Sequence, residues 1–325
     1  MTEMNILKSG FKMLVAGVVA LLILSIFSIV YGFSGIHISN SSGATDYKWE
    51  PNQYKSTMSE GFAWMKLDEN GFNNPVSSLV TPVDVLIMGS SHMEAVNIPV
   101  EFNAANRLRE LLSDTTVYNI GTSGHTIYQC AKNIRAAVLE FSPHYVVVET
   151  DRVDLNDEKM LAVLNNELAS IPSYDSGLLF YLQKYCPALK NIFKNLQDWK
   201  SANNRMGSTQ DDETAANKDL LSMFLNKMRL DSGDCKLIIL YQPTIRVDKD
   251  GELQGSSNGV DAFSAACVAN DIIFVDMTTE FQDLYEERRI LAHGFINTAV
   301  GEGHLNKYGH QVIAEQLAKV ILEER

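Results

Sequence analysis

Val83-Asp84-Val85-Leu86-Ile87-Met88-Gly89-Ser90-Ser91-His92 is the stretch around which we expect this chain to fold. Its first six residues are apolar or β-branched apart from Asp84, which is typical of a buried strand in a parallel sheet. The strand pattern stops at the small-residue turn Gly89-Ser90-Ser91. Such a turn can display a serine at the carboxyl edge of the sheet, where open α/β folds bind ligands. Gly-Ser-Ser after a strand is more often a plain turn, so the interpretation depends on the rest of the chain.

Four further apolar runs have the same strand-like character and alternate with helical patterns. The runs cover residues 116–120, 145–148, 237–241 and 272–275, and the last helix is expected to begin near Asn306, a good N-cap. Strands that alternate with helices at this pitch form right-handed βαβ units. The sequence therefore predicts an α/β fold, with three α/β/α layers around a mostly parallel sheet.

The N-terminal region contains an uncharged apolar segment, residues 13–33, that is long enough to cross a bilayer as a helix. Lys8 and Lys12 precede it, and the next basic residue is Lys48. This charge bias predicts a cytoplasmic N-terminus (1–12), a single-pass transmembrane anchor and an extracytoplasmic remainder. A cleaved signal peptide is the competing interpretation, although its apolar core is usually shorter, roughly 7–15 residues.

The remainder divides into two predicted parts. Residues 34–74 are polar with scattered aromatics and are expected to form a tether and a lead-in. Residues 75–325 are expected to form the domain, with a helical insertion at about 155–234. That segment carries leucines at helical spacing and two prolines that interrupt them.

Charge and cysteine content narrow the function classes. The chain has 27 Lys and Arg against 40 Asp and Glu, a net charge of −13, which argues against a nucleic-acid partner. Four cysteines (Cys130, Cys186, Cys235, Cys267) contain no C-x-x-C pair, so no zinc site is expected. One or two disulfides and four free thiols both remain open. We expect no cofactor and no metal.

A second chemical motif precedes the last predicted helix, in Gly301-Glu302-Gly303-His304. A serine is a poor nucleophile at neutral pH and needs a base within hydrogen-bond reach. The base in turn needs an acceptor that selects its tautomer and stabilises the imidazolium. His304 is the candidate base for Ser91, and Glu302 is the candidate acceptor from the same loop. A histidine in a loop is otherwise most often solvated or capping.

Together these motifs resemble the SGNH (GDSL-type) hydrolase superfamily. The resemblance covers roughly residues 83–322 and rests on the order of the motifs. Ser91 matches the block I serine, and His304 matches the block V histidine. Gly124, or less closely Gly121, matches the block II glycine whose N–H helps form the oxyanion hole. The resemblance therefore implies a catalytic set of Ser91, His304 and Glu302, with the N–H groups of Ser91 and Gly124 binding the oxyanion.

Two departures from the family pattern bear on the expected activity. The block III Gly-x-Asn-Asp is replaced by Glu149-Thr150-Asp151-Arg152, so the donor expected from Asn is missing or is supplied by Arg152. The carboxylate stands two positions before the histidine rather than three, and Ser90 stands where the family often has Asp. This arrangement is similar to the cell-surface branch of the superfamily, which includes the alginate O-acetyltransferase proteins. The anchor also resembles that of the D-alanyl transfer protein of teichoic acid biosynthesis. Such proteins act on a surface glycopolymer, often beside a membrane-bound acyltransferase.

Other polar residues are candidates for substrate binding or for alternative partners of the base. His92 follows the serine, and His125 lies in the glycine loop. Asp151, Arg152 and Asp154 follow the third strand, and Asp276 ends the fifth. His310, in the first turns of the last helix, is expected to face solvent.

We therefore expect a membrane-anchored serine acyltransferase or esterase that acts on an exported or cell-surface glycan through an acyl-Ser91 intermediate. The alternative is a non-catalytic module of the same fold that binds a surface glycan or scaffolds a membrane acyltransferase complex. A secreted lipase or thioesterase is a weaker third hypothesis, because no lipid-binding stripe stands out.

Overall fold

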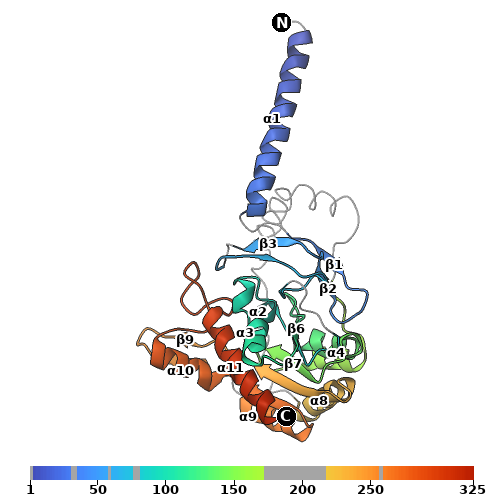
Figure 1. The fold of residues 1–325 in the computed structure, drawn as a ribbon, viewed down its shortest axis with the longest axis vertical. Coiled ribbons are helices and arrows are strands. Elements are labelled where there is room, and N and C mark those ends of the chain that lie inside the picture. The colour runs from blue at the N-terminus through green and yellow to red at the C-terminus, as the bar shows by residue number, and fades with distance from the viewer. Residues whose placement is uncertain (1–2, 31–34, 58–59, 76–80, 172–216, 256–258) are drawn as a thin grey trace.

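The computed structural model describes residues 3–30, 35–57, 60–75, 81–171, 217–255 and 259–325 (Figure 1). Its centre is a five-stranded sheet in the order β11-β8-β7-β5-β6, and every neighbouring pair is parallel. The strands are β5 (Val85–Met88), β6 (Val117–Asn119), β7 (Tyr145–Thr150), β8 (Lys236–Tyr241) and β11 (Ile273–Asp276). All five predicted strands are present, so the α/β fold class with a parallel sheet is confirmed.

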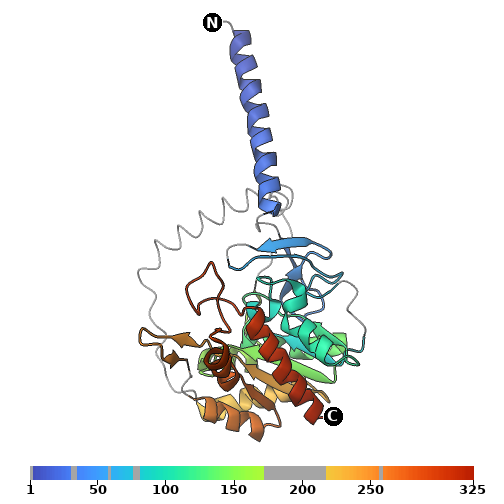
Figure 2. The same cartoon turned by 60° about the vertical axis from the view of Figure 1, so that its left-hand side comes forward.

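Helices cover both faces of this sheet, as Figures 1 and 2 show. One face carries α4 (Ile127–Phe141), α5 (Asp157–Leu164), α8 (Lys218–Asp231) and α9 (Val260–Ala269). The other face carries α3 (Ala104–Leu111), α10 (Thr278–Arg288) and α11 (Lys307–Glu323). Alternate residues of β5 supply the two cores: Leu86 and Met88 pack into the first, Val85 and Ile87 into the second. The predicted three layers follow directly from this period-two alternation.

The last helix begins at the capping residue that the sequence predicted for it. Asn306 caps α11, since its side chain accepts hydrogen bonds from the N–H groups of Tyr308 and Gly309. The sequence pattern did not predict α10 or the short α2 (Ser91–Glu94) that follows the serine turn directly. A 3-10 turn, η1 (Val100–Phe102), leads into α3, and a small hairpin pairs β9 (Arg246–Val247) with β10 (Leu253–Gln254).

The first helix, α1 (Glu3–Val30), projects away from the domain (Figures 1 and 2). Its residues Lys8–Phe27 have a mean hydropathy of 2.4 and only 6% of them are buried, so this helix has the length and composition to cross a membrane. The predicted apolar segment is therefore helical as far as Val30, its residues 31–33 lie outside the described residues, and its role as an anchor or a signal sequence remains a prediction.

Within the predicted tether and lead-in, the described residues form two antiparallel hairpins. One pairs β1 (His37–Ser39) with β2 (Tyr47–Trp49), and the other pairs β3 (Tyr54–Thr57) with β4 (Ala63–Lys66). Trp49, Ala63, Met65, Leu67 and Val96 form a small separate core beneath them. The hairpins lie on the end of the domain from which α1 projects (Figure 1). Of the predicted helical insertion, residues 172–216 lie outside the described residues.

Candidate active site

The turn after β5 presents Ser91 at the start of a helix. Ser90 is the N-cap of α2, and its hydroxyl accepts a hydrogen bond from the N–H of His92 at 3.2 Å. Ser91 is thus the first helical residue, whose backbone N–H has no carbonyl partner within its own helix. The hydroxyl and this N–H group lie at the carboxyl edge of the sheet, where the sequence predicted them.

The hydroxyl of Ser91 lies beside the imidazole of His304. The distance from Ser91 Oγ to His304 Nε2 is 2.8 Å. The other ring nitrogen, Nδ1, lies 2.6 Å from Oε2 of Glu60. A carboxylate can only accept, so Nδ1 carries the proton and Nε2 is left with the lone pair that faces the serine hydroxyl. The three side chains therefore form the hydroxyl–imidazole–carboxylate chain needed to activate a serine.

Glu60 also fixes the backbone of the histidine loop. Its Oε1 accepts the N–H of His304. Gly303, with φ of +103°, lies directly against this carboxylate, and a side chain at Gly303 would collide with it. Glycine is therefore required at Gly303 both for the left-handed backbone and for the close approach of Glu60.

Glu302 does not take the position expected for it. Its carboxylate is 53% exposed and lies 3.9 Å from Arg246, while Glu60 occupies the Nδ1 side of the His304 ring. The physical reason is the left-handed turn at Gly303, after which the histidine ring faces the β3–β4 connection rather than its own loop. Glu60 was missed because it lies 244 residues from His304 in the polar lead-in, where no strand end or motif marks it.

Two further histidines, His92 and His293, lie near His304. The ring centroid of His92 is 5.1 Å from that of His304 and 5.5 Å from that of His293. His92 Nδ1 accepts the N–H of Leu305 at 3.2 Å, and burial lowers the pKa of His92. Burial lowers the pKa of His293 to about 3. His92 therefore acts as a neutral acceptor that supports the loop, and no described contact joins it to Ser91 Oγ.

A buried carboxylate supports the serine turn from below. Glu149, near the end of β7, is 1% exposed, and its Oε2 accepts the N–H of Ser90 at 2.8 Å. Its Oε1 accepts from the side-chain amide of Gln242, whose carbonyl lies 2.8 Å from His293 Nε2. This chain of buried hydrogen bonds runs from the Ser90–Ser91 turn to the loop before α11. Glu149 begins the segment 149–152, in which the Asn donor expected from the resemblance is missing. Its carboxylate is instead a hydrogen-bond acceptor that orients the Ser90–Ser91 turn.

The two glycines considered for the oxyanion hole differ in their surroundings. Gly121 packs against the last turn of α2, where an added Cβ would lie 2.5 Å from the backbone nitrogen of Glu94. Its own N–H donates to the side chain of Asn119 at 2.9 Å. Among the described residues, a Cβ at Gly124 would meet Ile171 and Tyr47, at 3.8 and 4.0 Å, and Gly124 has a left-handed φ of +79°. Gly121 is thus the glycine that adjoins the serine helix, and the second oxyanion donor stays a prediction.

The remaining candidates lie elsewhere. Asp151 and Arg152 form an exposed ion pair with each other, 3.4 Å apart. Asp276 accepts hydrogen bonds from Thr278 at the start of α10. His125 is 3% exposed beside Asp46, and burial lowers its pKa to about 4. None of these side chains has a described contact with Ser91 or His304.

His310 also differs from its expected position. It is 1% exposed rather than facing solvent, because its Nδ1 accepts the N–H of Ala104 at the start of α3. Burial lowers its pKa to about 3. Cys130, Cys235 and Cys267 are free and buried, while Cys186 lies outside the described residues. Within the described part of the chain, no group of three or more His, Cys, Asp and Glu could hold a metal ion.

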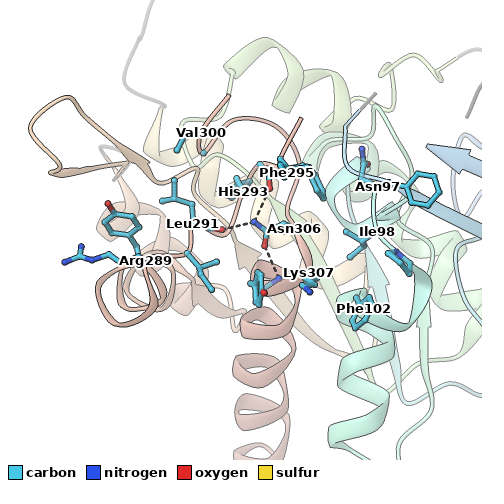
Figure 3. Close-up of a pocket in the computed structure, with 18 residues that line it drawn as sticks. Asn97, Ile98, Phe102, Arg289, Leu291, His293, Phe295, Val300, Asn306 and Lys307 are labelled. Carbon is cyan, nitrogen blue, oxygen red and sulfur yellow. Dashed lines mark hydrogen bonds between the residues drawn. The ribbon is translucent and has the colours of Figure 1, made fainter. Parts of the chain in front are cut away.

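A cavity of about 650 Å³ adjoins the histidine loop (Figure 3). One wall carries Asn97, Ile98 and Phe102, and the other carries Leu291, His293 and Phe295, with Asn306 and Lys307 at the start of α11. Asn306 holds this second wall in place by donating to the carbonyls of Leu291 and Gly294. Neither Ser91 nor His304 lines the cavity, so it neighbours the site without containing it.

No family model and no curated protein sequence matches the chain. Among solved structures, one described as a GDSL-like lipase from Parabacteroides merdae is 16% identical, over 74% of this chain and 96% of that chain, with a TM-score of 0.41. An acetyl xylan esterase is 15% identical, over 74% and 100%, with a TM-score of 0.41. A GDSL-like lipase from Bacteroides thetaiotaomicron is 14% identical, over 77% and 94%, with a TM-score of 0.37. These low values assign neither a family nor an activity, so the site must be judged by its own geometry.

Proposed function

We propose that this protein is a membrane-anchored serine acyltransferase or esterase of the SGNH type that acts on acyl groups of an exported or cell-surface glycan. The observation that carries the proposal is the continuous chain from Ser91 Oγ through His304 to Glu60, with distances of 2.8 and 2.6 Å. The carboxylate comes from a hairpin far away in sequence. Three groups from separate elements converge in the order that nucleophilic catalysis needs.

The proposed reaction has two steps. Ser91 Oγ attacks the acyl carbonyl while His304 Nε2 takes the hydroxyl proton, and the carboxylate of Glu60 stabilises the imidazolium that forms. The Ser91 N–H donates to the oxyanion of the tetrahedral intermediate. Collapse of the intermediate breaks the ester bond, and His304 returns the proton to the leaving alkoxide. A sugar hydroxyl or water then attacks acyl-Ser91 by the same steps in reverse, with His304 again as the base.

The proposed location follows from α1. The 20-residue span Lys8–Phe27, which carries no charge after Lys12, is about 30 Å long, the thickness of a hydrocarbon core. With Lys8 and Lys12 at its N-terminal end on the cytoplasmic side, the domain is extracytoplasmic. In this position it would meet exported glycans, and a membrane-bound acyltransferase could supply its acyl groups.

The competing proposal is a non-catalytic glycan-binding or scaffolding module. One observation favours it: the Gly121 N–H, the second candidate oxyanion donor beside α2, is already bound to Asn119. Catalysis then requires that a different donor, such as Gly124, or a small shift of the loop completes the oxyanion hole.

Turnover of an activated acetyl ester by the full chain in detergent micelles distinguishes these proposals. We expect turnover that Ser91→Ala reduces at least 10³-fold, since the triad residues act as a unit. Acceleration by an added oligosaccharide, with acyl transfer to it, identifies a transferase, and insensitivity to it identifies an esterase. Wild-type turnover equal to that of Ser91→Ala would support the non-catalytic module.

A further inference from the structure

The outer face of the β3–β4 hairpin is more apolar than a solvent-facing sheet should be. Its inner face follows the usual pattern, with Ala63 and Met65 buried against the small core of Trp49 and Leu67. The outward residues of an antiparallel hairpin are normally polar. Here the strand side chains directed outward include Tyr54 and Trp64, which are 58% and 56% exposed.

The register places Tyr54 and Trp64 on one face of the hairpin together with a lysine. Tyr54 pairs with Lys66 and Ser56 pairs with Trp64, and paired residues point to the same face. The ammonium group of Lys66 lies over the Tyr54 ring at 6.0 Å. We call Tyr54, Trp64 and Lys66 the aromatic face. Aromatic rings with a lysine are the composition that concentrates at the membrane–water interface.

The position of α1 indicates what covers this face. Helix α1 contacts β3, and both views place the hairpin at the end of the domain from which α1 leaves (Figures 1 and 2). The apolar segment of α1 continues to the last residue of the helix, Val30. A strand that contacts this helix therefore lies close to the point where the helix leaves the hydrocarbon core.

We propose that the aromatic face lies in the headgroup region of the bilayer that α1 enters. This inference rests on the proposed anchor. The net charge of −13 means that aromatic burial rather than charge attraction holds the face there. An exposed apolar patch beside an apolar spanning helix has the bilayer as its nearest apolar environment.

The consequence concerns the substrate. Glu60, the carboxylate that contacts His304, lies in the connection between β3 and β4, two residues before Phe62. Asn97 beside it donates to the Glu60 carbonyl at 3.0 Å. The hairpin that rests on the membrane therefore also completes the active site. The ester that this site reaches must be presented at the bilayer surface, as in an acyl carrier lipid or the membrane-proximal end of a growing glycan.

Depth-dependent fluorescence quenching tests the proposal in the full chain. The protein is reconstituted into phosphatidylcholine–phosphatidylglycerol vesicles that contain a lipid with a nitroxide at carbon 5 of its acyl chain. Subtracting the emission of Trp64→Phe from that of the wild type isolates Trp64 from the other two tryptophans. The matched control adds Leu230→Trp to the Trp64→Phe protein, because Leu230 is 71% exposed on α8, at the opposite end of the domain from α1.

We expect the Trp64 emission to be shifted to the blue and quenched at least threefold more strongly than the Leu230→Trp emission. If the protein floats with the vesicles but the Trp64 and Leu230→Trp emissions are quenched weakly and equally, the inference is overturned and the anchor stands. Protein that fails to float would overturn both the inference and the anchor. Ester turnover of the same preparations in micelles reports separately on the catalytic proposal.

Discussion

Glu60→Gln is the substitution that most sharply distinguishes the observed site from the one expected from sequence. Glutamine has the shape of glutamate and its carbonyl can still accept the N–H of His304. Its amide group, however, would face Nδ1 as a donor and favour the imidazole tautomer with the proton on Nε2. That proton points at Ser91 Oγ, 2.8 Å away, so the serine loses its base.

The magnitude follows from the geometry. With Nδ1 and Oε2 2.6 Å apart, the centres of the two charged groups are about 4 Å apart, and their attraction is roughly 4 kcal/mol at an effective dielectric of 20. The side chains of His304 and Glu60 are 29% and 18% exposed, so we reduce this to about 3 kcal/mol to allow for screening by water. Each 1.36 kcal/mol is a factor of ten in rate, which predicts a loss of about 10² in kcat with little change in KM.

The assay is steady-state turnover of an activated acetyl ester at pH 7.5, and Glu302→Gln is the matched control. Glu302 is 53% exposed and its nearest described cation is 3.9 Å away, so its substitution should change kcat less than threefold. A folded Glu60→Gln protein with wild-type kcat would refute the reasoning. A Glu302→Gln protein that loses as much activity as Glu60→Gln would also refute it.

Three further predictions concern the support of the site. Gly121→Ala places a Cβ 2.5 Å from the backbone of α2, so it should destabilise the fold by about 1–3 kcal/mol in urea unfolding and reduce kcat. Gly124→Ala meets no described atom closer than 3.8 Å, but the φ of +79° should cost about 1–2 kcal/mol of stability, while the folded protein should retain kcat within a few-fold. Glu149→Gln replaces one of the two acceptor oxygens with an NH2 group, which must face either the Ser90 N–H or the side-chain amide of Gln242, and both of these are donors. This buried donor–donor contact should lower the free energy of unfolding by about 1–3 kcal/mol. His293 and His310, with pKa values of about 3, are neutral when folded but bind protons below about pH 6.5 when unfolded. Stability should therefore fall as the pH drops from 7.5 to 5, by about 2 kcal/mol per histidine, and unchanged urea midpoints would contradict this.

The sheet could be predicted from sequence because its physical signal is local. Each strand is a short apolar run buried on both faces, and the right-handed crossover rule leaves few ways to assemble five such runs. The same rule predicts that the ends of β5 and the loop before α11 meet at one edge. The structure brings Ser91 and His304 together there at 2.8 Å. Their catalytic roles remain predictions.

The acidic partner could not be predicted because it depends on a contact between distant segments. Glu302 was expected from its closeness in sequence, but the φ of +103° at Gly303 turns the histidine toward Glu60. Nothing in the polar segment around Glu60 indicates that a hairpin folds back over α2. The burial of His310 was missed for a similar reason, since it depends on the packing of α11 against α3.

The most direct test of the central claim is the intact mass of the full chain after exposure to an alkyl fluorophosphonate, which mimics the tetrahedral intermediate and is not released by water. A site with an activated serine should gain one phosphonyl group, located on Ser91 by peptide mapping. The gain should be absent in Ser91→Ala, retained in Ser90→Ala and much slower in Glu60→Gln. Absence of any adduct on the wild-type protein, or an adduct that persists in Ser91→Ala, would contradict the account.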